Sequence, residues 1–123
     1  MGVMEGASKG AAEKGGLVVS LLPGGDAEEV NKYSSIIIPT GIGYARGQVL
    51  TNTVDGAILV EGGIGTYTEA ALMYLWQKPT VAVVSSGGCA EELAGKPMDK
   101  RGFPPIIAAQ DAEEAVELLY QKL

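Results

Sequence analysis

The sequence predicts an α/β protein built on a doubly wound parallel sheet, and three observations lead to this prediction. Short, β-branched and almost continuously apolar segments alternate with longer segments of helical periodicity. The apolar segments lack polar alternation, as is typical of parallel strands that are covered on both faces. The 18 glycines are too many for an ordinary helical bundle. A chain of 123 residues is long enough for one core, so we expect residues 1–123 to form a single domain.

The chain alternates between two kinds of segment, one typical of strands and one typical of helices. The predicted strands are GLVVSLL (16–22), SIIIPT (35–40), GAILVE (56–61) and PTVAVV (79–84). The predicted helices cover about 2–14, 42–54, 66–77 and 111–122. Alternation of this kind favours right-handed crossovers between parallel strands.

The last predicted helix carries a clear start signal. Asp111 can cap it, and Glu114 can complete a capping box. Four apolar residues then form the stripe that we expect to be buried: Ala115, Val116, Leu118 and Leu119. The segment 85–105 before it is too long for a bare connection, so we expect a short helix around 90–94.

The predicted order of elements begins on a helix. The first strand–helix–strand unit of a doubly wound sheet is therefore missing from the sequence, as in a shortened form or in a subunit whose sheet edge another subunit covers. An uncovered edge strand promotes association. We accordingly expect a homodimer or a higher homo-oligomer.

Composition excludes several classes of function. A net charge of −6 without a Lys/Arg cluster argues against a nucleic-acid partner. No apolar run approaches the length of a membrane span, no signal sequence is visible and Cys89 is the single cysteine, so we expect no membrane partner and a cytoplasmic protein. The absence of histidine removes Ser-His-Asp and Cys-His catalysis and imidazole metal ligands. We therefore predict no metal site and assign any acid–base chemistry to carboxylates.

The strongest candidate site is the glycine-rich stretch inside ILVEGGIGTYTEA (58–70). The predicted strand ends at Glu61, and the next helix is expected to begin near Thr66. Ligands of open α/β sheets bind beyond the carboxyl ends of strands, and the N–H groups of a helix start attract anions such as phosphate. A tight turn required only by helix–sheet packing is the alternative. The predicted ligand-binding residues are Gly62, Gly63, Ile64, Gly65 and Thr66.

A family resemblance makes this prediction more specific. EGGIGTYTE (61–69) resembles the P-G-G-x-G-T-x-x-E signature of the LONELY GUY, or lysine-decarboxylase-like, family. GIGYARGQVLTNTVDGAILV (41–60) is similar to the segment that carries an arginine in that family, and LLPG (21–24) to an earlier strand end. The likeness is greatest to the branch of small proteins related to the molybdenum-cofactor carrier protein. It implies a Rossmann-like fold, a nucleotide-type ligand and a homodimer.

The resemblance also implies roles for two charged residues. Glu69 and Arg46 match the glutamate and the arginine implicated in catalysis by enzymatic members, which hydrolyse nucleoside 5′-monophosphates to the free base and ribose 5-phosphate. A carboxylate can stabilise the positive charge that develops on ribose, and a guanidinium can hold phosphate oxygens. Alternatively, Thr66 and Glu69 form a capping box, and Arg46 is a surface residue. Glu61 stands where the family usually has proline.

Two main functional hypotheses follow. The chain binds a nucleotide or a pterin-type cofactor without chemistry, as a carrier, or it is a phosphoribohydrolase that uses Glu69 and Arg46. A shortened product without activity is a third possibility. Glu61 and the missing first unit favour the binding protein, for which no cofactor is required beyond the phosphate-bearing ligand itself.

Overall fold

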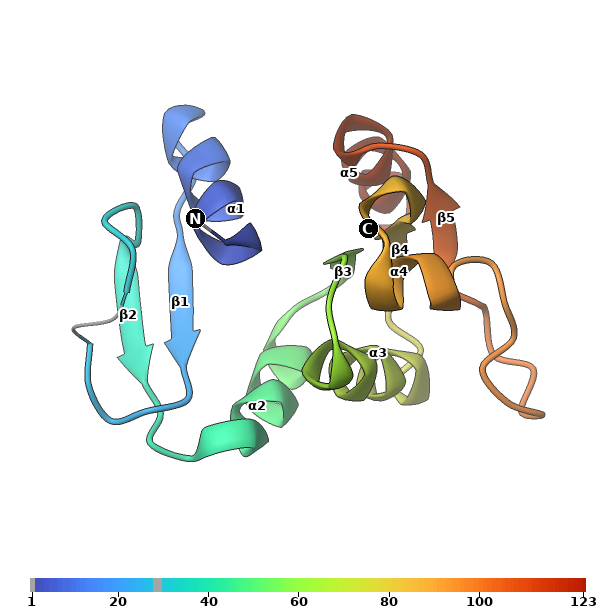
Figure 1. Cartoon of the computed structure of the whole chain (residues 1–123), viewed down its shortest axis with the longest axis horizontal. Helices are drawn as coiled ribbons and strands as arrows, with labels where there is room; N and C mark the ends of the chain where they lie inside the picture. Colours follow the sequence, from blue (N-terminus) through green and yellow to red (C-terminus); the bar gives the residue numbers. More distant parts are fainter. Residues whose placement is uncertain (1, 28–29) are drawn as a thin grey trace. The chain divides into compact units, whose positions relative to one another are not determined.

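The computed structural model describes residues 2–27 and 30–123, which fall into two compact units. The first unit extends to Arg46, and the second comprises Gly47–Leu123. Every strand pairing in the described residues is parallel, and α-helices separate most of the strands along the chain, so the predicted α/β class is confirmed (Figure 1). Within the described residues, no helix is both long enough and apolar enough to cross a membrane.

The first unit contains a two-stranded parallel sheet. β1 pairs with β2 so that Val19 lies opposite Ile36. All residues of β2 are exposed, whereas the sequence predicted a strand covered on both faces. β2 pairs along one edge only, and the described part of this unit contains a single α-helix, so its faces stay accessible. The elements are α1 (Val3–Glu13), β1 (Val19–Leu22), β2 (Ile36–Pro39) and the 3-10 helix η1 (Gly43–Ala45).

The second unit is built on a three-stranded parallel sheet in the order β3-β4-β5. The central strand β4 is fully buried, as predicted. β5 was not predicted from the sequence. The elements are α2 (Arg46–Thr53), which begins at the boundary between the units, β3 (Ala57–Val60), α3 (Ile64–Leu75), β4 (Thr80–Val83), the 3-10 helix η2 (Val84–Ser86), α4 (Gly88–Leu93), β5 (Ile107–Ala109) and α5 (Ala112–Tyr120).

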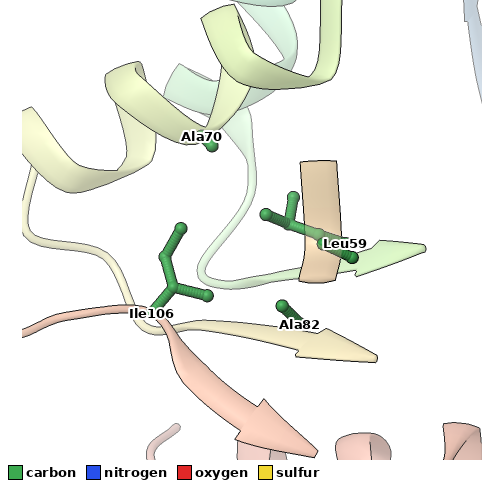
Figure 2. Close-up of a cluster of buried hydrophobic side chains, with 5 residues drawn as sticks. Leu59, Ala70, Ala82 and Ile106 are labelled. Atoms are coloured by element: carbon green, nitrogen blue, oxygen red, sulfur yellow. The ribbon is translucent and has the colours of Figure 1, made fainter. Parts of the chain in front are cut away.

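Helices pack on both faces of this sheet, as a doubly wound arrangement requires. Side chains alternate between the two faces of a strand. One face carries the cluster shown in Figure 2, in which α3 and α4 contribute alanines. The opposite face packs against α5 through Ala115. The first cluster comprises Leu59, Ala70, Ala82, Ala90 and Ile106, and the second comprises Val81, Val83, Ala109 and Ala115.

The predicted cap of α5 is confirmed. Asp111 Oδ1 accepts a hydrogen bond from the Glu114 amide at 2.8 Å, and the Glu114 carboxylate accepts one from the Gln110 amide at 2.9 Å. The predicted buried stripe is wrong at Val116, which is 59% exposed. The inward face of α5 follows the i, i+3, i+4 spacing of Ala115, Leu118 and Leu119, which leaves Val116 outside it.

Candidate functional site

The glycine-rich stretch forms the turn between β3 and α3. α3 begins at Ile64, with Gly63 as its N-cap, two residues earlier than the sequence predicted. Thr66 therefore lies inside the first helical turn, and no side chain caps the helix. The proposed capping box of Thr66 and Glu69 is wrong, because glycine is itself an acceptable N-cap and the helix starts there.

The turn presents unpaired amides at the start of α3. The Tyr67 amide makes the first helical hydrogen bond, to the Gly63 carbonyl at 3.1 Å. The preceding N–H groups, of Ile64, Gly65 and Thr66, have no intrahelical acceptor at this position. A Cβ built at Gly63 or Gly65 would meet nothing within 4 Å, so the main chain is open to approach. This arrangement can bind an anion through backbone amides.

The start of α4 holds the turn in place. The amides of Cys89 and Ala90 donate to the carbonyls of Gly62 and Glu61, both at 3.0 Å. A Cβ at Gly88 would lie 2.8 Å from the Gly62 carbonyl oxygen, so this contact requires glycine. Sequence reasoning missed these contacts between the start of α4 and the turn. Its signal was SSGG (85–88), which follows the neighbouring strand at the same edge of the sheet.

Glu61 adopts a backbone conformation that its side chain disfavours. Its φ is +51°, in the left-handed region. Its amide donates to Ser86 Oγ at 2.7 Å, and that hydroxyl donates to the Val83 carbonyl at 2.6 Å. Glu61 thus connects the ends of β3 and β4 through its main chain, while its side chain remains exposed.

Glu69 lies one helical turn beyond the free amides, half-buried on α3. A Cβ built at Gly47 would be 3.2 Å from Glu69 Cγ and 3.5 Å from Oε1. The carboxylate therefore packs against the first turn of α2. Among the described residues, it has no hydrogen-bond or ion-pair partner.

Arg46 is the first residue of α2, whereas the sequence predicted a helix that begins at about residue 42, and it belongs to the first unit. Its Nη1 donates to the Leu21 carbonyl, at the carboxyl end of β1, at 2.9 Å. Its Nε is shielded from solvent and has no partner among the described residues. Glu69 belongs to the second unit, so the joint action of the two residues on one ligand stays a prediction.

Cys89 is a poor candidate for a nucleophile. Cys89 is buried, and burial raises the pKa of its thiol, which disfavours the reactive thiolate. Within residues 2–27 and 30–123, no group of three or more His, Cys, Asp or Glu residues could hold a metal ion.

Comparison with other sequences connects this geometry to a family. The sequence model of the SLOG cluster4 family matches residues 1–116. An uncharacterized protein of Archaeoglobus fulgidus is 44% identical over 71 residues, which are 58% of this chain and 46% of that protein. The chain thus spans less than half of the length of this relative.

Solved structures resemble the whole fold. The crystal structure of TM1055 superimposes with a TM-score of 0.87 at 36% identity, over 98% of this chain and 73% of that one. The molybdenum cofactor binding protein of Rippkaea orientalis gives 0.81 at 30% identity, over 98% and 71%. The molybdenum cofactor carrier protein of Chlamydomonas reinhardtii gives 0.79 at 32% identity, over 98% and 70%. These likenesses confirm the predicted Rossmann-like fold.

Proposed function

The chain belongs to the SLOG cluster4 family, and from this premise we propose that it binds a phosphate-bearing nucleotide or pterin-type cofactor at the turn 62–66 and acts as a carrier. The observation that supports this proposal is the row of uncapped amides at the start of α3, beside glycines that leave the main chain open. Two structural neighbours are a molybdenum cofactor binding protein and a molybdenum cofactor carrier protein.

The donor set fits the phosphate of such a ligand better than it fits a metal. Backbone N–H groups of Ile64, Gly65 and Thr66 can donate to phosphate oxygens. The described residues contain no metal-ligand cluster, so this chain would hold a metal-bearing cofactor through its organic part.

The sharpest test removes one amide donor without breaking the helix. Ile64 is the first residue of α3 and is 85% exposed, and proline is well tolerated at this helical position. We expect Ile64→Pro to weaken binding of GMP, AMP or pterin-6-carboxylate about tenfold, the effect of losing one charge-assisted hydrogen bond. Ile64→Ala keeps the N–H group and is the matched control.

Isothermal titration calorimetry measures the affinities, and thermal denaturation checks that both variants remain folded. Ligand binding raises the melting temperature of the native chain when the ligand selects the folded state. If Ile64→Pro and Ile64→Ala bound the ligand with equal affinity, the turn would not be the binding site. A complete lack of binding by all three probes would remove the carrier function.

Phosphoribohydrolase activity is the second candidate, and the position of Glu69 favours it. Its carboxylate is half-buried and unpaired among the described residues, one helical turn from the proposed phosphate site. A carboxylate so placed can stabilise positive charge on ribose and direct water. Incubation with AMP, GMP, CMP and UMP, followed by assay of the free base, tests this function. Glu69→Gln should abolish release, and absence of release by the native chain would leave the carrier function alone.

A further inference from the structure

A cavity of the larger unit lies away from the glycine turn. Its volume is about 390 Å³, within the range of small-molecule sites. Thr80 and Ile107, the first residues of β4 and β5, contribute to its wall. The glycine turn follows the last residue of β3. Since the strands are parallel, the cavity and the turn lie at opposite edges of the sheet.

The wall of this cavity is mainly apolar and includes buried side chains. Tyr74 and Ile106 are 7% and 3% exposed, and Pro79 and Pro105 complete an apolar surface beside them. The Tyr74 hydroxyl is already used, because it donates to Asp99 Oδ1 at 2.6 Å. An apolar ring or a short alkyl chain would replace water here at little polar cost.

Two lysines, Lys78 and Lys122, contribute to the wall of the cavity, although the whole chain carries a net charge of −6. Lys78 is held in place because its Nζ donates to the carbonyls of Thr51 at 2.7 Å and Asn52 at 3.0 Å, which leaves one of three protons. Lys122 has no ion-pair partner among the described residues.

The acidic residue next to the cavity does not neutralise these charges. Asp99 contacts the cavity residue Tyr74, but it also forms an ion pair with Arg101. Gln77 also lines the cavity, and its side-chain amide has no hydrogen-bond partner among the described residues. The residues that line the cavity therefore include two lysines and no carboxylate.

We propose that this cavity binds a small organic anion with an apolar body, of the arylcarboxylate class. The ring lies against the prolines and Ile106, and the carboxylate pairs with Lys122 in the field of Lys78. This binding is independent of the function proposed for the glycine turn, because the two sites lie at opposite edges of the sheet.

Benzoate is the probe, and benzyl alcohol is its neutral counterpart of similar shape. Titration of the full ¹⁵N-labelled chain should shift the amide resonances of Thr80 and Ile107 with benzoate and leave those of Gly65 and Thr66 unchanged. We expect Lys122→Gln to weaken benzoate binding about tenfold, as expected for loss of a charge-assisted hydrogen bond. Lys96→Gln, at an exposed lysine outside the cavity, should not change it.

Three results would overturn the proposal. The first is the absence of shifts at Thr80 and Ile107 at millimolar benzoate. The second is equal affinity for benzyl alcohol and benzoate, or equal benzoate affinity in the native chain and Lys122→Gln. The third is a benzoate response confined to Gly65 and Thr66, which would assign the anion to the glycine turn.

Discussion

Thr66 occupies the space that a side chain at Gly62 would need. A Cβ built at Gly62 would lie 2.3 Å from Thr66 Oγ1 and 2.5 Å from Thr66 Cβ, both far inside van der Waals contact. The φ of Gly62 is +87°, which L side chains rarely adopt. Close packing of the helix start onto the turn thus depends on glycine at this position.

We therefore expect Gly62→Ala to destabilise the protein by about 2 kcal/mol or more, from overlap with Thr66 and from backbone strain. Urea unfolding measures the loss. Gly65→Ala is the matched control, because its Cβ would meet nothing within 4 Å and alanine favours a helix. A Gly62→Ala variant as stable as Gly65→Ala would contradict this packing.

Glu61 provides a second test of the turn. The LONELY GUY family, which the turn resembles in sequence, usually has proline at this position. Proline fixes φ near −65° and lacks an N–H group. Glu61 has φ +51° and donates its amide to Ser86 Oγ. We expect Glu61→Pro to cost about 3 kcal/mol or more in unfolding free energy, whereas Glu61→Gly should gain about 1 kcal/mol by relieving the left-handed conformation.

Chemical denaturation of both variants and of the native chain measures these two changes in unfolding free energy. A stable Glu61→Pro protein would mean that the turn adopts another conformation, which does not need a hydrogen bond from residue 61 to Ser86. In that case the N–H groups at the start of α3 would also lie in positions that differ from those described above.

The sequence was sufficient to place the glycine turn at the end of a strand but not to place the helix start. Thr66 with Glu69 fits a capping box, yet Gly63 caps the helix, because the choice depends on how Gly62 packs under Thr66. β5 was missed because it is only three residues long and contains two alanines, which have low strand propensity. Its pairing with β4 comes from tertiary structure, which local patterns do not encode.

The site was predictable only in part for a related reason. Ser86 and Gly88 reach the turn from the next strand end, and a single stretch of sequence does not show such contacts. Patterns of apolar residues predicted the core of β4 correctly but overestimated the burial of β2, since burial depends on which elements cover a strand.

The end of α3 offers a stability prediction. Gln77 has φ +53°, and its amide donates to the Tyr74 carbonyl at 2.9 Å while that of Lys78 donates to the Met73 carbonyl at 3.0 Å. This is a Schellman motif whose left-handed position usually holds glycine. Gln77→Gly should raise the unfolding free energy by about 1 kcal/mol.

The matched control is Gln121→Gly at the end of α5, where φ is −64°. Glycine there brings no relief of strain and should lower stability by roughly 0.5 kcal/mol. Opposite signs for the two glutamine variants are the expected result of thermal denaturation. If both variants lost stability, the side chain of Gln77 would stabilise the protein by more than its left-handed backbone conformation destabilises it.

The segment 94–106 joins α4 to β5. A pH-dependent hydrogen bond connects this segment to the end of α3. The hydrogen bond to Asp99 raises the pKa of Tyr74 above its ordinary value of 10.0, and the same bond lowers the pKa of Asp99 below 3.8. The Tyr74 contribution is complete below pH 10.0 and is lost as pH rises through the folded pKa. The Asp99 contribution is present above pH 3.8 and is lost as pH falls through its folded pKa.

Tyr74→Phe removes this bond and keeps the aromatic ring that faces Phe103, at a centroid distance of 5.3 Å. The melting temperature of the native chain should exceed that of Tyr74→Phe most between pH 3.8 and 10.0, with a difference that shrinks outside this range. Tyr120→Phe, at a tyrosine that is 79% exposed, should match the native profile. A difference that is constant with pH would show that the hydroxyl stabilises the segment without its bond to the Asp99 carboxylate.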